Sequence, residues 1–423
     1  MSLSLVLLND TLRWHDNPLL QSTTGRKAAV VVLNKAAFFG QQYGIRRANL
    51  QRLQQQLALI TALEKSLATH NIGLITLFGD TAHCIRSLAG HLNATELYCA
   101  EPVSPYEYSA IYQLSDTLNI SQLDCNSLLG AELKPDNASL PDSFTPFRKQ
   151  REPLLLVSPP IAAGNSDNNW LTPEQTRAYN SDFAGLLLKF RAAAQPLCQE
   201  QAALAHLQRY IWQQQHILHY KQTRNQLHGE NYASFCSSAI ALGCLSVREL
   251  WHNITQFERS VEANESTYWL KFELLWREFF RWQFRKYGAR WFSRNAIKGQ
   301  PDYTPAVLSA RQHERFQLWC SAKTGVAFID ANMRLLNQTG LMSNRGRQNV
   351  ASFLIHDLGI DWRLGAAYFE QRLLDYDCAS NWGNWAYIAG TGNSNERQFN
   401  VDKQAKIYDA DGGFVRAMLQ STP

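Results

Sequence analysis

The sequence predicts an α/β N-terminal domain with a parallel sheet, followed by an all-α C-terminal domain. Up to about residue 130, short apolar runs alternate with helical stretches, a pattern typical of a parallel sheet covered by helices. From about residue 200 onward, apolar residues recur at the three- and four-residue spacing of helices. Between these regions, seven of the 14 prolines fall at positions 135–173, which indicates an extended connector. We therefore expect domains at residues 1–133 and 201–423, joined by a linker at 134–200.

The first domain should contain four buried strands and one long amphipathic helix. The strands are expected at residues 3–8, 28–33, 73–78 and 95–99, and the helix at 41–70. The N-terminus has no basic segment and soon meets Asp10, so it favours a first strand over a signal peptide. No G-x-G-x-x-G follows that strand, so the sheet is Rossmann-like without the dinucleotide fingerprint.

The second domain should be a bundle of packed helices. Its periodic segments are 232–257, 268–286, 310–322, 326–337 and 345–357. Ten of the 12 tryptophans lie after residue 200, which is consistent with a large helical core.

Composition excludes several classes of protein. No run approaches the roughly 18 apolar residues of a membrane span, so we expect no membrane partner. The eight cysteines are scattered without a Cys-x-x-Cys pair, which favours reduced thiols in the cytoplasm and no structural zinc. Residues 1–140 carry 10 basic and 11 acidic side chains of the 41 and 36 in the chain, leaving 31 and 25 afterwards. The net +6 of the later part weakly favours a polyanion partner.

Residues 341–400 hold the most informative group of polar and indole side chains. Its members are Asn344, Arg347, Asp375, Asp377, Asn381, Trp362 and Trp385. A buried arginine and a buried carboxylate each lose too much hydration unless they pair or hold a polar ligand. With tryptophans around such a pair, the segment favours a site for a redox-active ring over a hydrolytic centre.

This segment closely resembles the flavin pocket of the DNA photolyase and cryptochrome family, and is nearest to the DASH-type cryptochromes. The resemblance covers essentially the whole chain, weakly to residue 135 and strongly from about 218 to 412. It implies FAD as the cofactor, with Arg347 paired to Asp375 beside the isoalloxazine ring and Asn344 one helical turn from Arg347. It also implies that Asp377 binds the amide edge of the ring and that Asn381 faces its reactive nitrogen.

A second set of FAD contacts is implied around the diphosphate. It comprises Ser234 and Ser237, while Tyr220 and Arg224 are implied elsewhere around the cofactor and Arg277 on its flavin side. The hydroxyls near residues 233–237 could cap a helix or bind an anion at its N-terminus, and the resemblance favours the anion. The family pattern is broken at Ala233 and Phe235, where a hydroxyl and a basic residue are usual. Either the phosphate charge is less neutralised here or another cation supplies the charge, and Arg224 is the candidate.

Three tryptophans match the electron-transfer chain of the family. By resemblance, Trp385, Trp362 and Trp319 lead from the flavin to the surface and re-reduce an oxidised, photoexcited flavin. Without the resemblance, the three indoles are equally explained as core residues.

Glu273, Trp276 and Arg277 share one helical face. They could form an exposed ion pair, but the resemblance places Arg277 against the flavin and directs Glu273 and Trp276 toward a DNA lesion. Trp276 would stack on a flipped pyrimidine dimer. The other implied DNA contacts are Asn344, Arg345, Tyr387 and Arg397.

The implied function is light-driven repair of cyclobutane pyrimidine dimers by electron transfer from excited reduced FAD, in single-stranded or looped DNA, where flipping costs least. The alternative is a blue-light photoreceptor, although the retained Asn381 and lesion residues and the end at Pro423 favour an enzyme. We expect the protein to be a monomer. Repair of 6-4 photoproducts ranks lower because no histidine matches the pocket. A folate antenna (methenyltetrahydrofolate) is possible by analogy, with Glu107 and Glu152 as contacts that could equally be surface carboxylates. No metal site is expected, since His216 and His219 lack partners at ligand spacing.

Overall fold

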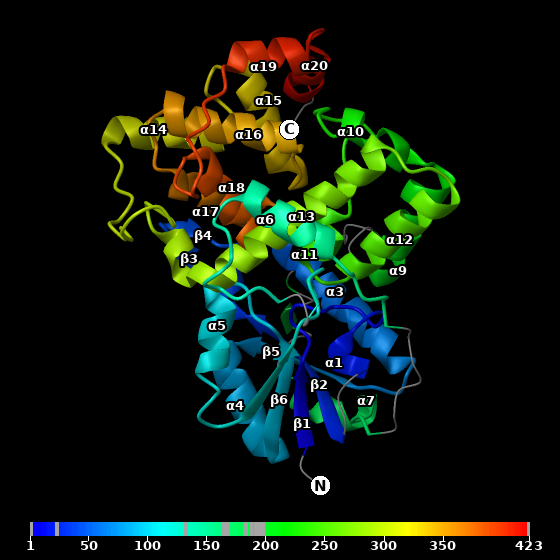
Figure 1. The fold of residues 1–423 in the computed structure, drawn as a ribbon. Helices are drawn as coiled ribbons and strands as arrows, with labels where there is room; N and C mark the ends of the chain where they lie inside the picture. The colour runs from blue at the N-terminus through cyan, green and yellow to red at the C-terminus, as the bar shows by residue number, and fades with distance from the viewer. Residues whose placement is uncertain are drawn as a thin grey trace.

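The computed structural model describes residues 3–21, 25–130, 134–161, 169–180, 185–186, 189 and 199–420. A five-stranded, all-parallel sheet lies at one end and a bundle of helices at the other (Figure 1). The strand order is β5-β2-β1-β6-β7. The strands are β1 (Leu3–Leu7), β2 (Arg26–Asn34), β5 (Leu74–Gly79), β6 (Ala94–Ala100) and β7 (Asn119–Leu123). This arrangement confirms the predicted fold class.

All four predicted strands are present in the five-stranded sheet, and the fifth strand of this sheet, β7, was missed. The central strand β1 is buried along its whole length; it is apolar except for Ser4, whose hydroxyl donates to Glu96. The missed strand β7 lies at the sheet edge, and its residues are exposed or only partly buried. Its sequence NISQL therefore lacks the apolar run by which buried strands are recognised.

The predicted helix at 41–70 is wrong over its first third. A short hairpin, β3 (Gln41–Gln42) and β4 (Ile45–Arg46), precedes α3 (Leu50–Ala68). Tyr43 and Gly44 both have positive φ, at 52° and 76°, as a tight hairpin turn demands. Asn49 then caps α3 by accepting a hydrogen bond from the Arg52 amide.

The remaining helices of the first domain and the connector are short. They are α1 (Pro18–Gln21), α2 (Lys35–Phe39), α4 (Thr81–Leu92), α5 (Pro105–Tyr112), α6 (Phe144–Arg151), η2 (Glu152–Leu154), α7 (Pro173–Thr176) and η3 (Arg177–Tyr179). The prediction of a connector without helix is wrong at α6, which packs along α13 of the second domain (Figure 1). Pro146 lies in the first turn of α6, where proline is tolerated, and Pro153 comes only after the helix has ended.

Among its described residues, the elements of the second domain are all helices. Its elements are α9 (Glu200–Leu207), η5 (Gln208–Gln213), η6 (His216–His219), α10 (Tyr220–Thr223), α11 (Ser237–Ala241), α12 (Val247–Ser260), α13 (Glu265–Tyr287), η7 (Gly288–Phe292), α14 (Ala310–Cys320), α15 (Ala327–Thr339), α16 (Asn344–Ser352), η8 (Phe353–Asp357), α17 (Trp362–Arg372), α18 (Cys378–Ile388), α19 (Val401–Tyr408) and α20 (Gly413–Gln420). The segment predicted as one helix at 232–257 is divided between α11 and α12. Gly243 makes the break, with φ of +72° and a position so close to Asp10 that a Cβ would clash with its carbonyl.

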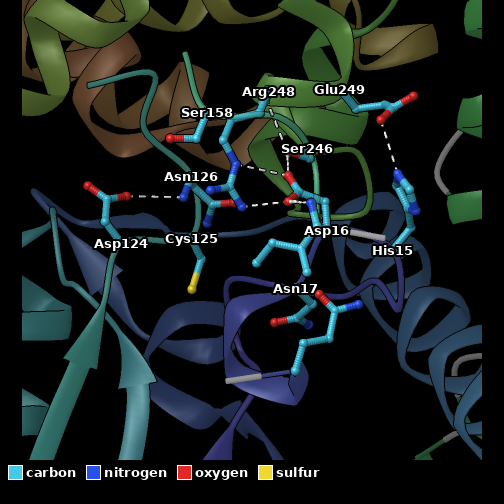
Figure 2. A network of polar contacts seen from close by, with 12 residues as sticks. His15, Asp16, Asn17, Asp124, Cys125, Asn126, Ser158, Ser246, Arg248 and Glu249 are labelled. Atoms are coloured by element: carbon cyan, nitrogen blue, oxygen red, sulfur yellow. Dashed lines mark hydrogen bonds and ion pairs between the residues drawn. The ribbon is translucent and has the colours of Figure 1, made fainter. Parts of the chain in front are cut away.

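A polar network fastens the two domains together (Figure 2). Arg13 is buried and donates to Asn126 Oδ1 and to the carbonyl of Gly243. Asp16 accepts from Arg248 at 2.6 and 3.0 Å and from the Ser246 hydroxyl. Because these partners come from the loop after β1 and from the start of α12, the network fixes the sheet against the bundle.

Candidate active site

The helical domain contains a cavity of about 460 Å³ that gathers most of the predicted site residues. The predicted residues that line it are Arg224, Glu273, Trp276, Arg277, Asn344, Arg345, Arg347, Asp375, Asp377, Asn381, Trp385, Tyr387 and Arg397. They come from α13, α16, α18 and the segments beside these helices, so residues 170 positions apart in sequence meet in one hollow. Such a concave site with a few convergent polar groups is typical of ligand binding.

One wall of the cavity is a face of α13. Trp269, Glu273, Trp276, Arg277 and Phe280 recur at the three- and four-residue spacing that puts side chains on one side of a helix. The sequence analysis missed Trp269 and Phe280, although this same spacing could have found them. Glu273 forms an ion pair with Arg224 at 2.6 Å, and burial raises the pKa of its carboxyl. Arg224 is therefore already matched by a carboxylate.

Arg277 differs from Arg224 and Arg347, the two arginines of the cavity that are paired with carboxylates. Its Nη1 donates to the carbonyl of Asn126 at 2.9 Å, and no carboxylate lies within ion-pair distance of it among the described residues. Burial, with the nearby charge of Arg281, lowers the pKa of Arg277 to about 10. A cation held so deeply without an adjacent counter-ion is poised to receive an anionic group.

Arg347 and Asp375 form the predicted pair. Arg347 Nη2 donates to both carboxylate oxygens of Asp375, at 2.9 and 2.8 Å, and its Nε donates to the carbonyl of Met342. The Asp375 carboxylate also accepts from the Ser237 hydroxyl at 2.9 Å. Its charge and hydrogen-bonding capacity are thereby largely satisfied within the protein, which makes the pair a fixed wall for a ligand.

The N-terminus of α18 forms the floor between Asp375 and Trp385. Asp377 caps the helix, with Oδ1 accepting from the Ser380 amide at 2.7 Å. Asn381 is buried, and its Nδ2 donates to the carbonyl of Ala366 at 3.0 Å. This bond orients the amide, so the other Asp377 oxygen and the Asn381 amide oxygen remain as acceptors toward a ligand in the cavity.

The three tryptophans do not form the predicted line to the surface. Trp385 lines the cavity, but Trp319 packs directly against Trp385, with 6.3 Å between ring centroids, and has 0% exposure. Trp362 instead contacts Trp382 at 5.9 Å. The expectation that Trp319 ends the chain at the surface is therefore wrong, because α14 turns this indole inward, where it donates to the carbonyl of Val350.

The predicted diphosphate hydroxyls lie outside the cavity lining. Helix α11 has only five residues, and Ser237 is committed to Asp375. Ser234 lies before the helix, where its carbonyl contacts His206. Tyr220 is buried and also does not line the cavity. A phosphate role for Ser234 and Ser237 remains a prediction.

A second cavity, of about 390 Å³, lies between the sheet domain and the helical domain. It is lined by the ends of β1, β2 and β6, the usual ligand position in a parallel sheet. Burial and the nearby Glu107 raise the pKa of Asp10, one of its lining residues, to about 8. Arg277, Tyr376 and Asp377 line both cavities, so they form a shared wall.

The two predicted antenna carboxylates do not meet in this space. Glu107 lines the second cavity, but it completes the capping box of α5 by accepting from Ser104. Glu152 is bound elsewhere, by Arg148 at 2.6 Å and by the Tyr268 hydroxyl at 2.9 Å. Glu152 does not line this cavity, since the connector carries it onto α13, and a contact of both carboxylates with one antenna ring stays a prediction.

The described part of the chain contains neither a membrane-spanning helix nor a cluster of metal-ligand side chains. No helix there is long and apolar enough to cross a membrane. No group of three or more potential metal-ligand side chains occurs among the same residues.

Comparison with known proteins agrees with this geometry. Residues 269–421 match the FAD binding domain of DNA photolyase, and residues 4–164 match the DNA photolyase family. Cryptochrome DASH from Natronomonas pharaonis is 37% identical over 99% of this chain and 90% of its own, and that from Synechocystis is 37% identical over 98% and 87%. The crystal structure of a Synechocystis cryptochrome matches with a TM-score of 0.86 and 35% identity, over 99% of this chain and 89% of the other. An archaeal photolyase from Sulfolobus tokodaii, described with two FAD molecules, shares the fold at a TM-score of 0.75 and 22% identity, over 100% and 91%. The chain therefore belongs to the DNA photolyase and cryptochrome family and groups with the proteins named cryptochrome DASH.

Proposed function

We propose that this protein uses FAD and blue light to split cyclobutane pyrimidine dimers in DNA, preferentially in single strands. The observation that carries the proposal is that a single cavity joins two kinds of surface. Its floor carries Asp377 and Asn381, and its α13 wall carries Glu273 and Trp276. A cofactor on the floor would thus lie directly beside a lesion held by the wall.

The residues present fit FAD. Arg277 supplies a buried cation for an anionic group, and Asp377 and Asn381 supply hydrogen-bond acceptors for a ring. Three buried polar atoms beside this space, Arg224 Nε, Arg345 Nε and the Tyr376 hydroxyl, have no hydrogen-bond partner among the residues that the structure describes. Buried polar groups normally find a partner, so a polar ligand would complete the site. When bound and reduced, FAD supplies the light-driven electron for dimer splitting.

The residues at the wall and mouth fit a flipped pyrimidine dimer. Trp276 and Tyr387 lie 5.7 Å apart as an aromatic pair, and stacking on such rings is worth about 1–3 kcal/mol per base. The Glu273 carboxylate, with its raised pKa, can exchange hydrogen bonds with pyrimidine edges. Arg345 and Arg397 supply charge for phosphates. Single strands are favoured because they have no base pairs to break before flipping.

An antenna chromophore belongs to the same proposal. The second cavity adjoins the first through Arg277, Tyr376 and Asp377, so a folate or another light-absorbing ring there would lie close to the flavin. Of the two carboxylates first considered, only Glu107 reaches this cavity.

Illumination of dimer-containing oligonucleotides tests the proposal. The FAD-loaded protein, chemically reduced, should restore thymines in a single-stranded oligonucleotide under blue light and leave it unchanged in the dark. A duplex of the same sequence should be repaired more slowly. If flavin-loaded, reduced protein restores no thymine in either substrate, the repair function is wrong and the photoreceptor alternative takes its place.

A further inference from the structure

The indole of Trp276 is held in place by a ring from the connector. Phe144, the first residue of α6, stacks on Trp276 with 3.7 Å between ring centroids and 10° between ring planes. Phe144 is buried and does not line the cavity, whereas Trp276 does. Phe144 therefore covers the side of the indole that faces away from the cavity.

Phe144 is itself enclosed by α13. Its ring makes edge contacts with Phe272 and Phe279, at 5.2 and 5.9 Å. Phe272, Trp276 and Phe279 lie four and three residues apart, on one face of the helix. The phenyl ring thus fills a three-sided aromatic socket, and one of its sides is Trp276.

The connector is fastened to α13 on both sides of this stack. Before Phe144, Gln283 donates to the carbonyl of Pro141 and Lys286 donates to that of Leu140, each at 2.8 Å. After it, Phe147 is fully buried against Phe279, at 5.4 Å between centroids. Arg148 and Glu152 then bind the Tyr268 hydroxyl, at 3.1 and 2.9 Å. The connector consequently runs along α13 and cannot shift the Phe144 ring freely.

We propose that Phe144 is a positioning residue for dimer recognition, and that it acts by locking the plane of Trp276 before DNA arrives. This inference rests on the proposed repair function. A flat side chain already stacked on one side presents a single face or edge to the cavity, so less rotational freedom is lost when a base stacks on it. Fixing the indole should matter for a dimer inside the cavity and little for phosphates outside it.

A double-mutant cycle in the FAD-loaded protein tests the inference. Binding of single strands with and without one thymine dimer is measured by fluorescence anisotropy in the dark for wild type, Phe144→Leu, Trp276→Ala and the double variant. Phe144→Leu keeps apolar volume but removes the flat ring, and it should weaken dimer binding about three- to tenfold. Binding of the undamaged strand should change less than about twofold. In the Trp276→Ala background, Phe144→Leu should have no further effect, because its partner is already gone.

Phe147→Leu is the matched control, since it loosens the same helix without touching Trp276. It should leave the preference for the dimer unchanged. Flavin content and melting temperature show whether each variant is folded. If Phe144→Leu is not folded, Phe144→Met replaces it in the cycle. Equal weakening of both strands, or an equal loss with and without Trp276, would overturn the positioning role. If the wild type itself does not prefer the dimer, it is the proposed function that fails.

Discussion

At the residue scale, the cavity holds two arginines that are matched by carboxylates of the protein and others that are not. Glu273 offsets Arg224 and Asp375 offsets Arg347, so both pairs are complete before any ligand binds. Arg277 has only a carbonyl as a close partner among the described residues. Its charge is therefore available to attract an anionic cofactor in the cavity.

Asp375→Asn tests the structural value of the Arg347 pair. The substitution should leave Arg347 without a counter-ion and lower the free energy of unfolding by about 1–3 kcal/mol, less than for a fully buried pair because the Arg347 side chain is 28% exposed. Chemical denaturation and the flavin content of the purified protein measure the effect. Glu265→Gln, which removes an exposed pair with Lys221, should cost below about 0.5 kcal/mol. Equal losses for the two variants would contradict the account.

Two indole substitutions distinguish an electron relay from a core residue. Trp385→Phe should strongly slow photoreduction of oxidised flavin, because Trp385 lines the cavity, and should spare repair by chemically reduced enzyme. Trp319→Phe should leave photoreduction near wild type, because Trp319 is fully enclosed and cannot pass the charge to solvent. Flavin absorbance under blue light with a thiol reductant measures both rates. Comparable slowing in the two variants would restore Trp319 to the electron path.

At the element scale, apolar periodicity was enough to place four strands and the main helices. It failed where a single backbone position decides the path, as at the Tyr43-Gly44 turn and at Gly243. It also failed for α6, whose prolines suggested an extended chain although burial of Phe144 and Phe147 makes a helix favourable. The pocket residues were placed by family motifs, and thirteen of them meet in the cavity. Side-chain direction was beyond those motifs, which is why the inward turn of Trp319 and the distant position of Glu152 were not foreseen.

The contact between the loop after β1 and α12 should titrate. A hydrogen bond to Glu249 raises the pKa of His15 above its usual 6.5, and the same bond lowers the pKa of Glu249 below its usual 4.5. The stabilisation from His15 is complete below pH 6.5 and is lost as pH rises through the raised value. The contribution of Glu249 is present above pH 4.5 and is lost in acid. The pair should therefore stabilise most between about pH 5 and 6.

Glu249→Gln measures this contribution. The difference in unfolding free energy from wild type should be greatest near pH 5–6, at up to about 1 kcal/mol for a partly exposed pair, and should shrink toward pH 8. Glu258→Gln on the same helix is the control, because its partner is a lysine, Lys271, and not a histidine. A pH-independent difference for Glu249→Gln would show that His15 stays neutral.

At the scale of the whole molecule, the two domains and the connector each contribute to one site. The sheet domain supplies most of the second cavity and the carbonyl that binds Arg277. The helical domain supplies the first cavity, and the connector supplies the ring behind Trp276. Because the Arg13 and Asp16 network fixes the domains against each other, the wall shared by the cavities keeps one geometry (Figure 2).

The basic rim of the cavity predicts how DNA binding depends on salt. Arg345 is held by Asn225 and Gln348, and Arg397 lies over Tyr387, so each presents its charge at a defined place. Each phosphate contact on a single strand contributes about 0.7 to the slope of log K against log salt. The variant with Arg345→Gln and Arg397→Gln should therefore depend less on salt, with a slope that is smaller in magnitude by about 1.4, for damaged and undamaged strands alike. Arg311→Gln, at an exposed position that does not line the cavity, should leave the slope unchanged. A slope equal to that of wild type in the double variant would show that the strand crosses another face of the protein.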